Sequence, residues 1–173
     1  MVNIKGFHGT LDAKADKIIK YGFIPSSKTF EWLGSGVYFF ANQKDADKWA
    51  WMETHKKQNY GAQPAVLSAD IVAEDKSFCD LDFRINMDRM IAETEKIIKQ
   101  INGKIKADLS DAQMRCACCN FFARKNGIKV YAYTFPSVTS NEIGFPYTRK
   151  QRQLCVRDSS CIINLYKCRK GGI

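Results

Sequence analysis

Two short segments of this sequence carry residue types that suit the binding of a flat, positively charged ring. The stretch FHGT contains His8 followed by Gly9, and the stretch GSGVYFFA contains Gly36 two positions before Tyr38. Trp49 follows Tyr38 by eleven residues. An aromatic face attracts a cation by about 0.5–2 kcal/mol, so either aromatic ring could hold such a ligand. Gly9 has no side chain, so its backbone would be open to close approach by a ligand.

We expect a mixture of strands and helices to position these residues. Strands are expected at 4–8, 36–41, 65–73, 129–136, 152–158 and 160–168, with a short extension at 77–82, and helices at 12–21, 43–57, 83–101 and 111–125. Gly22 suits the end of the first helix, and Ser110 suits the start of the last one. A tight turn at 158–160 is expected to join the last two strands. This order favours an α+β fold in which strands from both ends of the chain come together.

The composition is that of one folded domain spanning residues 1–173, with 45% hydrophobic residues. No apolar stretch approaches the roughly 20 residues needed to cross a bilayer. The N-terminal segment is too short in its apolar part to be a secretory signal, so we expect a cytoplasmic protein without a membrane partner. The seven cysteines are odd in number and irregularly spaced, which favours free thiols in a reducing compartment.

A cluster of cysteines raises the alternative of a zinc site. Cys116 with Cys119, or the adjacent Cys118 and Cys119 with distant Cys155 or Cys161, could supply thiolates. However, neighbouring cysteines on a helix point in different directions, and no second Cys-x-x-Cys pair or nearby histidine completes a ligand set. We therefore expect no metal, since free cysteine also packs well as a small core residue.

Positive charge is concentrated near the C-terminal end of the sequence. The formal net charge is +9, and residues 149–173 contribute +6 of it through seven basic residues and one acid, Asp158. Such a segment is typical of a contact with a polyanion, such as nucleic acid or a phosphate-bearing cofactor. A solvated surface segment is the alternative explanation.

Residues 3–55 resemble the NAD-binding core of ADP-ribosyltransferases of the diphtheria-toxin and poly(ADP-ribose) polymerase type. That family combines a strand ending in His-Gly-Ser/Thr, a helix followed by Gly-Phe or Gly-Leu, a Gly-x-Gly-Ile/Val-Tyr-Phe segment and a helix with a second aromatic. The matching segments here are FHGT, YGF, GSGVYFFA and DADKWA. Residues 150–165 resemble the strand that carries the family's catalytic glutamate, and Gln153 takes the glutamate's position.

The resemblance implies an α+β fold with two small, mainly antiparallel sheets that form a split core around an NAD cleft and are flanked by helices. NAD would be the co-substrate. His8 would contact a ribose hydroxyl, the Gly9 backbone would hold the nicotinamide amide, and Tyr38 would stack on the nicotinamide ring. The implied cofactor-binding residues are His8, Gly9, Thr10, Gly36, Tyr38 and Trp49, and the implied catalytic residues are His8, Tyr38 and Gln153.

Two departures from the family pattern bear on the reaction. Gln153 keeps a hydrogen-bonding oxygen but has no charge, and an amide cannot act as a general base at neutral pH. We therefore expect transfer of single ADP-ribose units rather than a polymer, onto an acceptor that is nucleophilic enough to react without strong help from a base. Glu142, in the preceding loop, is an alternative source of a base acting from a distance. Ala46 occupies the position of a serine that bonds the nicotinamide amide in the polymerases, which suggests weaker NAD binding.

The acceptor is expected to meet the strand around Gln153. Gln151 lies on the same side of that strand, at the position that helps to select the acceptor in related toxins. Arg149, Lys150 and Arg152 are expected to surround it with positive charge. These residues favour nucleic acid over protein as the acceptor.

The expected function is therefore NAD-dependent mono-ADP-ribosyl transfer, which is a pentosyl transfer. By analogy of context, the protein resembles a bacterial or phage-related effector or defence toxin, with a neutralising antitoxin or other regulator as a further partner. Three alternatives stay open. They are a catalytically weak binding module of the same fold for NAD, ADP-ribose or nucleic acid, transfer to a protein acceptor, and a small zinc protein.

Overall fold

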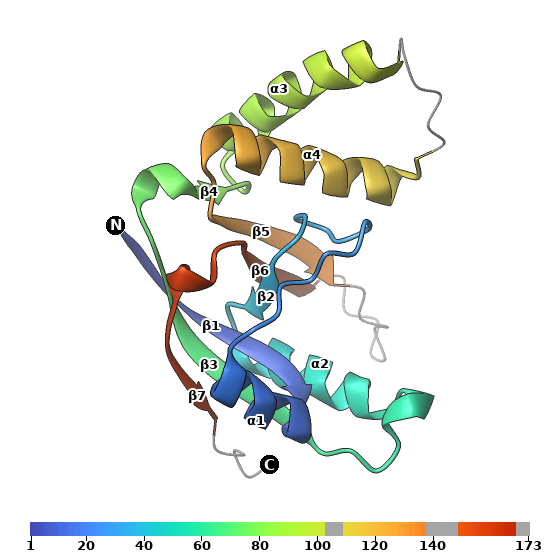
Figure 1. Ribbon diagram of the computed structural model, residues 1–173, viewed down its shortest axis with the longest axis vertical. Coiled ribbons are helices and arrows are strands. Elements are labelled where there is room, and N and C mark those ends of the chain that lie inside the picture. The colour runs from blue at the N-terminus through green and yellow to red at the C-terminus, as the bar shows by residue number, and fades with distance from the viewer. Residues whose placement is uncertain (103–108, 138–148, 169–173) are drawn as a thin grey trace.

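The computed structural model describes residues 1–102, 109–137 and 149–168 (Figure 1). The strands are β1 (Val2–Leu11), β2 (Val37–Phe40), β3 (Pro64–Ala73), β4 (Phe78–Asp80), β5 (Val130–Ser137), β6 (Arg149–Val156) and β7 (Ile162–Lys167). The longer helices are α1 (Asp12–Tyr21), α2 (Gln43–Thr54), α3 (Arg84–Asn102) and α4 (Asp111–Asn126). Short 3-10 turns cover Lys57–Asn59, Asp75–Ser77 and Ser159–Cys161. This mixture confirms the α+β class.

The strands of these described ranges form a single mixed sheet in the order β4-β5-β6-β2-β1-β3-β7. The expected division into two separate sheets is therefore not seen. The link between β1 and β2 is nevertheless narrow, because the one register pair Phe7–Phe40 joins them. By contrast, the register of β1 against β3 runs without a break from Val2–Ala73 to Leu11–Pro64. Beyond the Phe7–Phe40 pair, the halves β4-β5-β6-β2 and β1-β3-β7 part.

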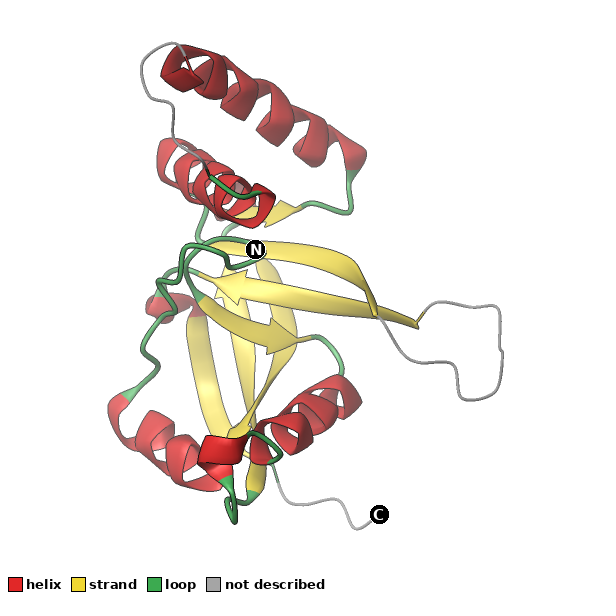
Figure 2. Cartoon of the chain, turned by 90° about the vertical axis from the view of Figure 1, so that its right-hand side faces the viewer, coloured by secondary structure: helices red, strands yellow, loops and turns green. Residues whose placement is uncertain are grey.

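The helices cover different parts of this sheet. α2 packs Ala46 and Ala50 against Phe40 on one face, and α1 packs Ala15 against Leu67 on the other. Figure 2 shows these two helices on either side of the sheet, while α3 and α4 lie together at the opposite end of the molecule. The α1–α2 end therefore encloses the region where the two halves of the sheet separate.

Local sequence signals place the ends of α1 and α4 as expected. α1 spans Asp12–Tyr21 and ends at Gly22, whose φ of 82° lies in the region that glycine adopts most readily. Ser110 caps α4 reciprocally. Its hydroxyl accepts from the Gln113 N–H, and the Gln113 side chain accepts from the Ser110 N–H at 2.9 Å. Gly127, with φ 66°, ends that helix.

The last two strands differ from the sequence-based expectation. The turn at Ser159–Cys161 is present, but β6 lies between β2 and β5, whereas β7 pairs with β3 at the edge of the sheet. An alternating apolar pattern identifies a strand but not its partner, so the pattern could not separate β6 from β7. β6 also begins at Arg149, earlier than expected, and Glu142 lies outside the described residues. Within the described ranges, no helix has the length and apolarity needed to cross a membrane.

Candidate functional site

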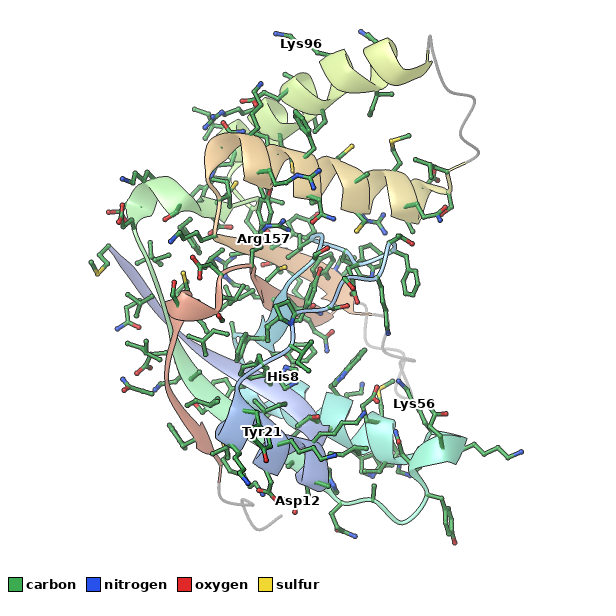
Figure 3. The ribbon with its side chains drawn as sticks, in the orientation of Figure 1. His8, Asp12, Tyr21, Lys56, Lys96 and Arg157 are labelled. Carbon is green, nitrogen blue, oxygen red and sulfur yellow. The ribbon has the colours of Figure 1, made fainter. Side chains whose placement is uncertain are left out.

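A cleft of about 740 Å³ opens where β1 and β2 separate, between α1, the loop of residues 22–36 and α2. It gathers residues from the N-terminal strand, from β2, from α2 and from β6. The sequence-predicted residues that line it are His8, Gly9, Thr10, Gly36, Tyr38, Trp49 and Gln153. Figure 3 shows His8 close to the α1 side of this region, between Tyr21 and Arg157.

The His8 ring is held by the backbone of Tyr38. Nδ1 lies 2.8 Å from the Tyr38 carbonyl oxygen. Because a carbonyl can only accept, Nδ1 carries the hydrogen and Nε2 keeps its lone pair. Phe23 and Phe39 pack edge-on against the ring, with centroids 5.1 and 5.8 Å away. Burial lowers the pKa of His8, and the hydrogen bond to Tyr38 offsets this only in part, so His8 is neutral at pH 7.

Tyr38 fastens the loop of residues 22–36. Its hydroxyl donates to the Gly34 carbonyl at 2.7 Å and accepts from the Leu33 N–H at 2.9 Å. Gly34 adopts φ +81°, a conformation that strains residues with a side chain. Burial is the main cause that raises the pKa of the Tyr38 phenol far above its usual value. The hydroxyl therefore anchors the loop, and Tyr38 is also one of the residues that line the cleft.

Two residues outside the loop hold it from the other side. Asn120 of α4 accepts from the Ser35 N–H at 2.8 Å and from Arg157 Nη1 at 2.7 Å. Arg157 Nη1 also donates to the Ser35 carbonyl at 2.8 Å. The loop is thus anchored to α4 and to the end of β6, although these elements are distant in sequence.

The glycines at the site are required by packing. A Cβ at Gly9 would lie 2.2 Å from the Ala46 carbonyl oxygen and 3.0 Å from the Ala50 nitrogen, so a side chain there would displace α2 from β1. A Cβ at Gly36 would lie 2.6 Å from Cys155 Sγ. Ala46 is fully buried and does not line the cleft. The sequence-based roles for Gly9 and Ala46 considered the ligand alone, whereas the structure gives both positions a packing role.

Trp49 and Gln153 reach the cleft from α2 and from β6. The Trp49 ring is 46% exposed and lies 6.2 Å from Phe40, centroid to centroid. Gln153 is partly exposed and pairs in register with Phe40 on β2. The register pair Tyr38–Cys155 follows along the same two strands. The β2–β6 ladder therefore fixes the spacing of Tyr38 and Gln153 along one edge of the cleft.

Two basic residues of β6, Lys150 and Arg152, do not gather around Gln153. Arg152 forms ion pairs with Asp80 at 2.6 Å and with Asp82 at 2.5 Å. Lys150 is exposed and lines a separate hollow that includes Asp82 and Arg84. Since alternate residues of a strand point to opposite faces, Lys150 and Arg152 point away from Gln153.

The remaining residues assigned to the acceptor are placed as follows. Gln151 shares the face of Gln153 and donates to Asp45 Oδ1 at 3.4 Å. Arg149 is the first residue of β6, and its side chain lies outside the described part of the protein. Gln151 therefore has a hydrogen-bond partner in the N-terminal turn of α2, the helix that carries Trp49.

Sequence reasoning missed a cationic wall on α1. Lys14, Lys17, Ile18 and Tyr21 line the cleft, and their spacing puts them on one face of the helix. Lys14 and Lys17 are exposed and form no ion pair with any described residue. The helical spacing was visible in the sequence, but which face meets the cleft depends on how α1 packs on β3.

The loop of residues 22–36 adds two further groups to the cleft. Glu31 lines it and accepts a hydrogen bond from the Ser26 hydroxyl. Trp32 lines it too, with its ring 5.2 Å from Phe135 and with the Arg115 guanidinium 4.0 Å above it. A loop residue gives no periodic signal, so no sequence pattern pointed to either of them.

The cysteines are free thiols, and most of them are buried. Cys116 and Cys119 lie in the core beneath the loop, where their thiols approach the carbonyl oxygens of Lys28 and Trp32. Burial raises the pKa of Cys119 to about 12. In the described residues, no group of three or more His, Cys, Asp or Glu side chains is arranged to hold a metal ion.

Comparison with known proteins gives a partial match. No family model matches the chain. Over 76 residues the chain is 30% identical to a Methanocaldococcus jannaschii protein described as "Uncharacterized protein MJ0359". The match spans 43% of this chain and 36% of that protein.

Proposed function

We propose that this protein is an NAD-dependent mono-ADP-ribosyltransferase. The observation that carries the proposal is the single cleft shared by His8, Tyr38, Trp49 and Gln153, which come from segments far apart in the sequence. The resemblance assigns each of these residues to an NAD site from the sequence alone. Their convergence on one cleft supports the assignment.

The chemistry of the cleft suits the nicotinamide end of NAD. The nicotinamide ring of NAD is a flat cation, and the rings of Tyr38 and Trp49 offer it aromatic faces. His8 is neutral, and its Nε2 can accept a hydrogen bond from a ribose hydroxyl because Nδ1 is already committed to Tyr38. The Gly9 backbone lies beside them for the amide of the nicotinamide.

The cationic wall suits the other end of the same ligand. NAD carries a pyrophosphate, and Lys14 and Lys17 offer two ammonium groups that no described acid neutralises. α1 begins directly after β1, so this wall follows His8 and Gly9 along the chain. The described strands form one continuous sheet, so the proposal rests on the residues of the cleft and not on a split core.

The reaction that this cleft suits is transfer of one ADP-ribose unit. The bond between ribose C1′ and the nicotinamide nitrogen breaks, and its electron pair stays with the nicotinamide. The positive charge left on C1′ and the ring oxygen is then relieved by a lone pair of the acceptor, which forms the new bond to C1′ and loses its proton. Gln153 can bond to a ribose hydroxyl during these steps but cannot take up the proton.

Nucleic acid is the acceptor that we favour, and α2 supplies the better argument for it. Trp51 on α2 is 56% exposed, and Tyr60, a few residues after that helix, is 97% exposed. Lys48 and Lys57 are exposed on the same segment. Aromatic faces with interspersed cations are typical of surfaces that bind single-stranded nucleic acid. Arg152 and Lys150, which point away from the cleft, contribute less to this interaction than their place in the sequence suggests.

A binding module without catalysis is the competing function. The amide of Gln153 favours it, because that side chain lacks the charge that stabilises the reacting ribose in the family. The proposed setting, a cytoplasmic effector or defence toxin controlled by an antitoxin, rests on analogy and applies to the enzyme alone.

The test is the release of nicotinamide from NAD by the purified protein, with and without RNA, DNA or cell extract. The wild-type protein should release nicotinamide, and label from the adenine portion of NAD should appear in a nuclease-sensitive fraction. Tyr38→Ala should abolish both signals. Tyr38→Phe keeps the ring but loses both hydrogen bonds to the loop, so it separates stacking from anchoring of residues 33 and 34.

Two outcomes would replace the proposed function or its acceptor, and one variant tests the nucleic-acid surface. NAD binding without nicotinamide release would establish the binding module instead of the enzyme. Label found only in a protease-sensitive fraction would replace nucleic acid by a protein acceptor. Trp51→Ala should lower transfer to nucleic acid roughly tenfold, since stacking of one base is worth about 1–3 kcal/mol, while release of nicotinamide into water continues.

A further inference from the structure

The cleft contains a carboxylate that the sequence comparison did not assign. Gln153 takes the position of the family's glutamate and carries no charge. Of the described residues that line the cleft, Glu31 alone has a carboxylate. It lies on the loop between α1 and β2, on a different segment from Gln153, so neither alignment nor spacing drew attention to it.

The loop that carries Glu31 is held in place by several contacts. The backbones of Ser26 and Gly36 exchange two hydrogen bonds, of 2.9 and 3.0 Å, which close the loop at its base. The Ser26 hydroxyl donates to the Glu31 carboxylate, and the Gly34 N–H donates to the Glu31 carbonyl at 3.3 Å. Tyr38 fixes residues 33 and 34 from below. A group fixed in this way loses little conformational entropy when it interacts with a ligand.

The charge of Glu31 is directed at the cleft without a neutralising partner. Glu31 is partly buried and forms no ion pair with any described lysine or arginine. Its field reaches Tyr38. Burial is the largest cause of the raised pKa of the Tyr38 phenol, and the Glu31 carboxylate adds to it. Glu31 and Tyr38 line the same cleft, so the negative charge faces the pocket proposed to hold nicotinamide.

We infer that Glu31 is the catalytic carboxylate of this protein, acting from the loop in place of a glutamate on β6. This inference rests on the proposed function. As the C1′–nitrogen bond breaks and its electron pair leaves with nicotinamide, the carboxylate stabilises the positive charge on the ribose. When the acceptor's lone pair bonds to C1′, the proton of the acceptor passes to Glu31 and from there to water. Ser26 positions the carboxylate.

The experiment measures nicotinamide release and NAD affinity for Glu31→Gln, with Glu74→Gln as the control. Glu74 is an exposed glutamate at the end of β3, so its replacement removes the same charge away from the cleft. Glu31→Gln should lower kcat about 100-fold, and the Kd for NAD measured by calorimetry should change less than about threefold. Glu74→Gln should match the wild type in both quantities.

A structural role for Glu31 predicts a different pattern. If Glu31 only braces the loop, then Ser26→Ala, which removes the same hydrogen bond and keeps the charge, should cost as much activity as Glu31→Gln. Our inference predicts that Ser26→Ala, which keeps the charge and loses only the positioning hydrogen bond, costs clearly less activity than Glu31→Gln, and that adding Gln153→Glu to Glu31→Gln restores part of the activity. If Glu31→Gln is not folded by circular dichroism, Glu31→Asp replaces it, with an expected intermediate kcat.

The outcomes separate this inference from the function on which it rests. An active wild type with a Glu31→Gln kcat within threefold of it would overturn the role of Glu31 and leave the transferase intact. Equal losses in Ser26→Ala and Glu31→Gln would also overturn it. A wild type that releases no nicotinamide would remove the proposed function, and the role of Glu31 with it.

Discussion

α1 and the C-terminal strands both supply basic residues, but those residues differ in whether acidic side chains neutralise them. On α1, Lys14 and Lys17 face the cleft without ion-pair partners among the described residues. On β6 and β7, Arg152 is bound by Asp80 and Asp82, and Lys167 is bound by two aspartates of α1. Arg157 is likewise used to hold the loop.

This difference shows why a count of charges along the sequence is a poor guide to a binding surface. The C-terminal segment is the more basic of the two, yet its described cations mostly stabilise the fold. The short α1 carries fewer positive charges, but two of them remain available to a ligand. An anion in the cleft would therefore meet the cationic wall on α1. The lysines of α1 would then serve ligand binding, while the cations of the C-terminal strands serve stability.

The largest expected effect is on stability, at Arg152. Arg152→Gln leaves Asp80, which is only 8% exposed, without its cation. We expect a loss of about 2–3 kcal/mol in the free energy of unfolding, below the value for a fully buried pair because the Arg152 side chain keeps 31% of its exposure. Urea unfolding measures it, with the exposed neighbour Lys150→Gln as control. A stable Arg152→Gln variant with weakened NAD binding would reverse the proposed division of roles.

The next effect is on NAD affinity, at α1. Replacing Lys14 and Lys17 together with glutamine should weaken NAD binding roughly 30-fold, at about 1 kcal/mol for each lost charge–phosphate contact. The melting temperature should stay within about 2 °C of the wild type, since neither lysine forms an ion pair with a described residue. Calorimetry provides the affinity, and NADH can replace NAD as a probe of the pyrophosphate.

The matched control removes the same two charges elsewhere. Lys96 and Lys99 are exposed on α3, and Figure 3 shows Lys96 at the α3 end of the molecule, away from His8. Changing both to glutamine should leave the affinity for NAD unaltered. An equal loss of affinity in the two double variants would mean that net charge matters and that the α1 wall does not.

A third effect is a dependence of stability on pH that arises from His8. His8 lines the same cleft as the cationic wall on α1, and in its neutral form it adds no charge there. Burial lowers the pKa of His8 below its unfolded value of 6.5. The unfolded chain therefore binds this proton more readily than the folded one, so the contribution of His8 is fully present above pH 6.5 and falls as the pH drops below that value. Urea unfolding at pH 7.5 and at pH 5.5 should show the decrease.

The two histidines can be separated by substitution. His8→Gln should reduce the difference in stability between the two pH values, although it also removes the contact with the Tyr38 carbonyl. His55→Gln should not change the difference, since His55 is exposed on the surface. A pH dependence that persists in His8→Gln would assign the effect to another group.

The smallest expected effect is at Lys167. Its ammonium lies 3.1 Å from Asp12 and 2.6 Å from Asp16, and these partners raise its pKa. All three groups are in contact with solvent, so Lys167→Gln should lower the melting temperature by about 2 °C or less and should not affect NAD affinity. A large loss of NAD affinity in Lys167→Gln would extend the cationic wall to β7.

Much of the local structure was determined by the sequence itself. The bounds of α1, the stop at Gly22, the cap at Ser110 and the α+β class followed from patterns of neighbouring residues. Capping and helical periodicity act within a few residues, so they can be recognised without a fold. The resemblance also named His8, Tyr38, Trp49 and Gln153, which the structure brings to one cleft.

Only the tertiary structure decided which of these side chains are available to a ligand. The pairing of β5 with both β4 and β6 brings Arg152 to Asp80, and the packing of α1 on β3 directs Lys14 and Lys17 into the cleft. Glu31 enters the same cleft because Tyr38, Asn120 and Arg157 fix its loop. Strand order and loop anchoring depend on contacts between residues far apart in the sequence. No pattern of neighbouring residues encodes these contacts, so only the fold determines which charged side chains, Lys14, Lys17 and Glu31, line the cleft.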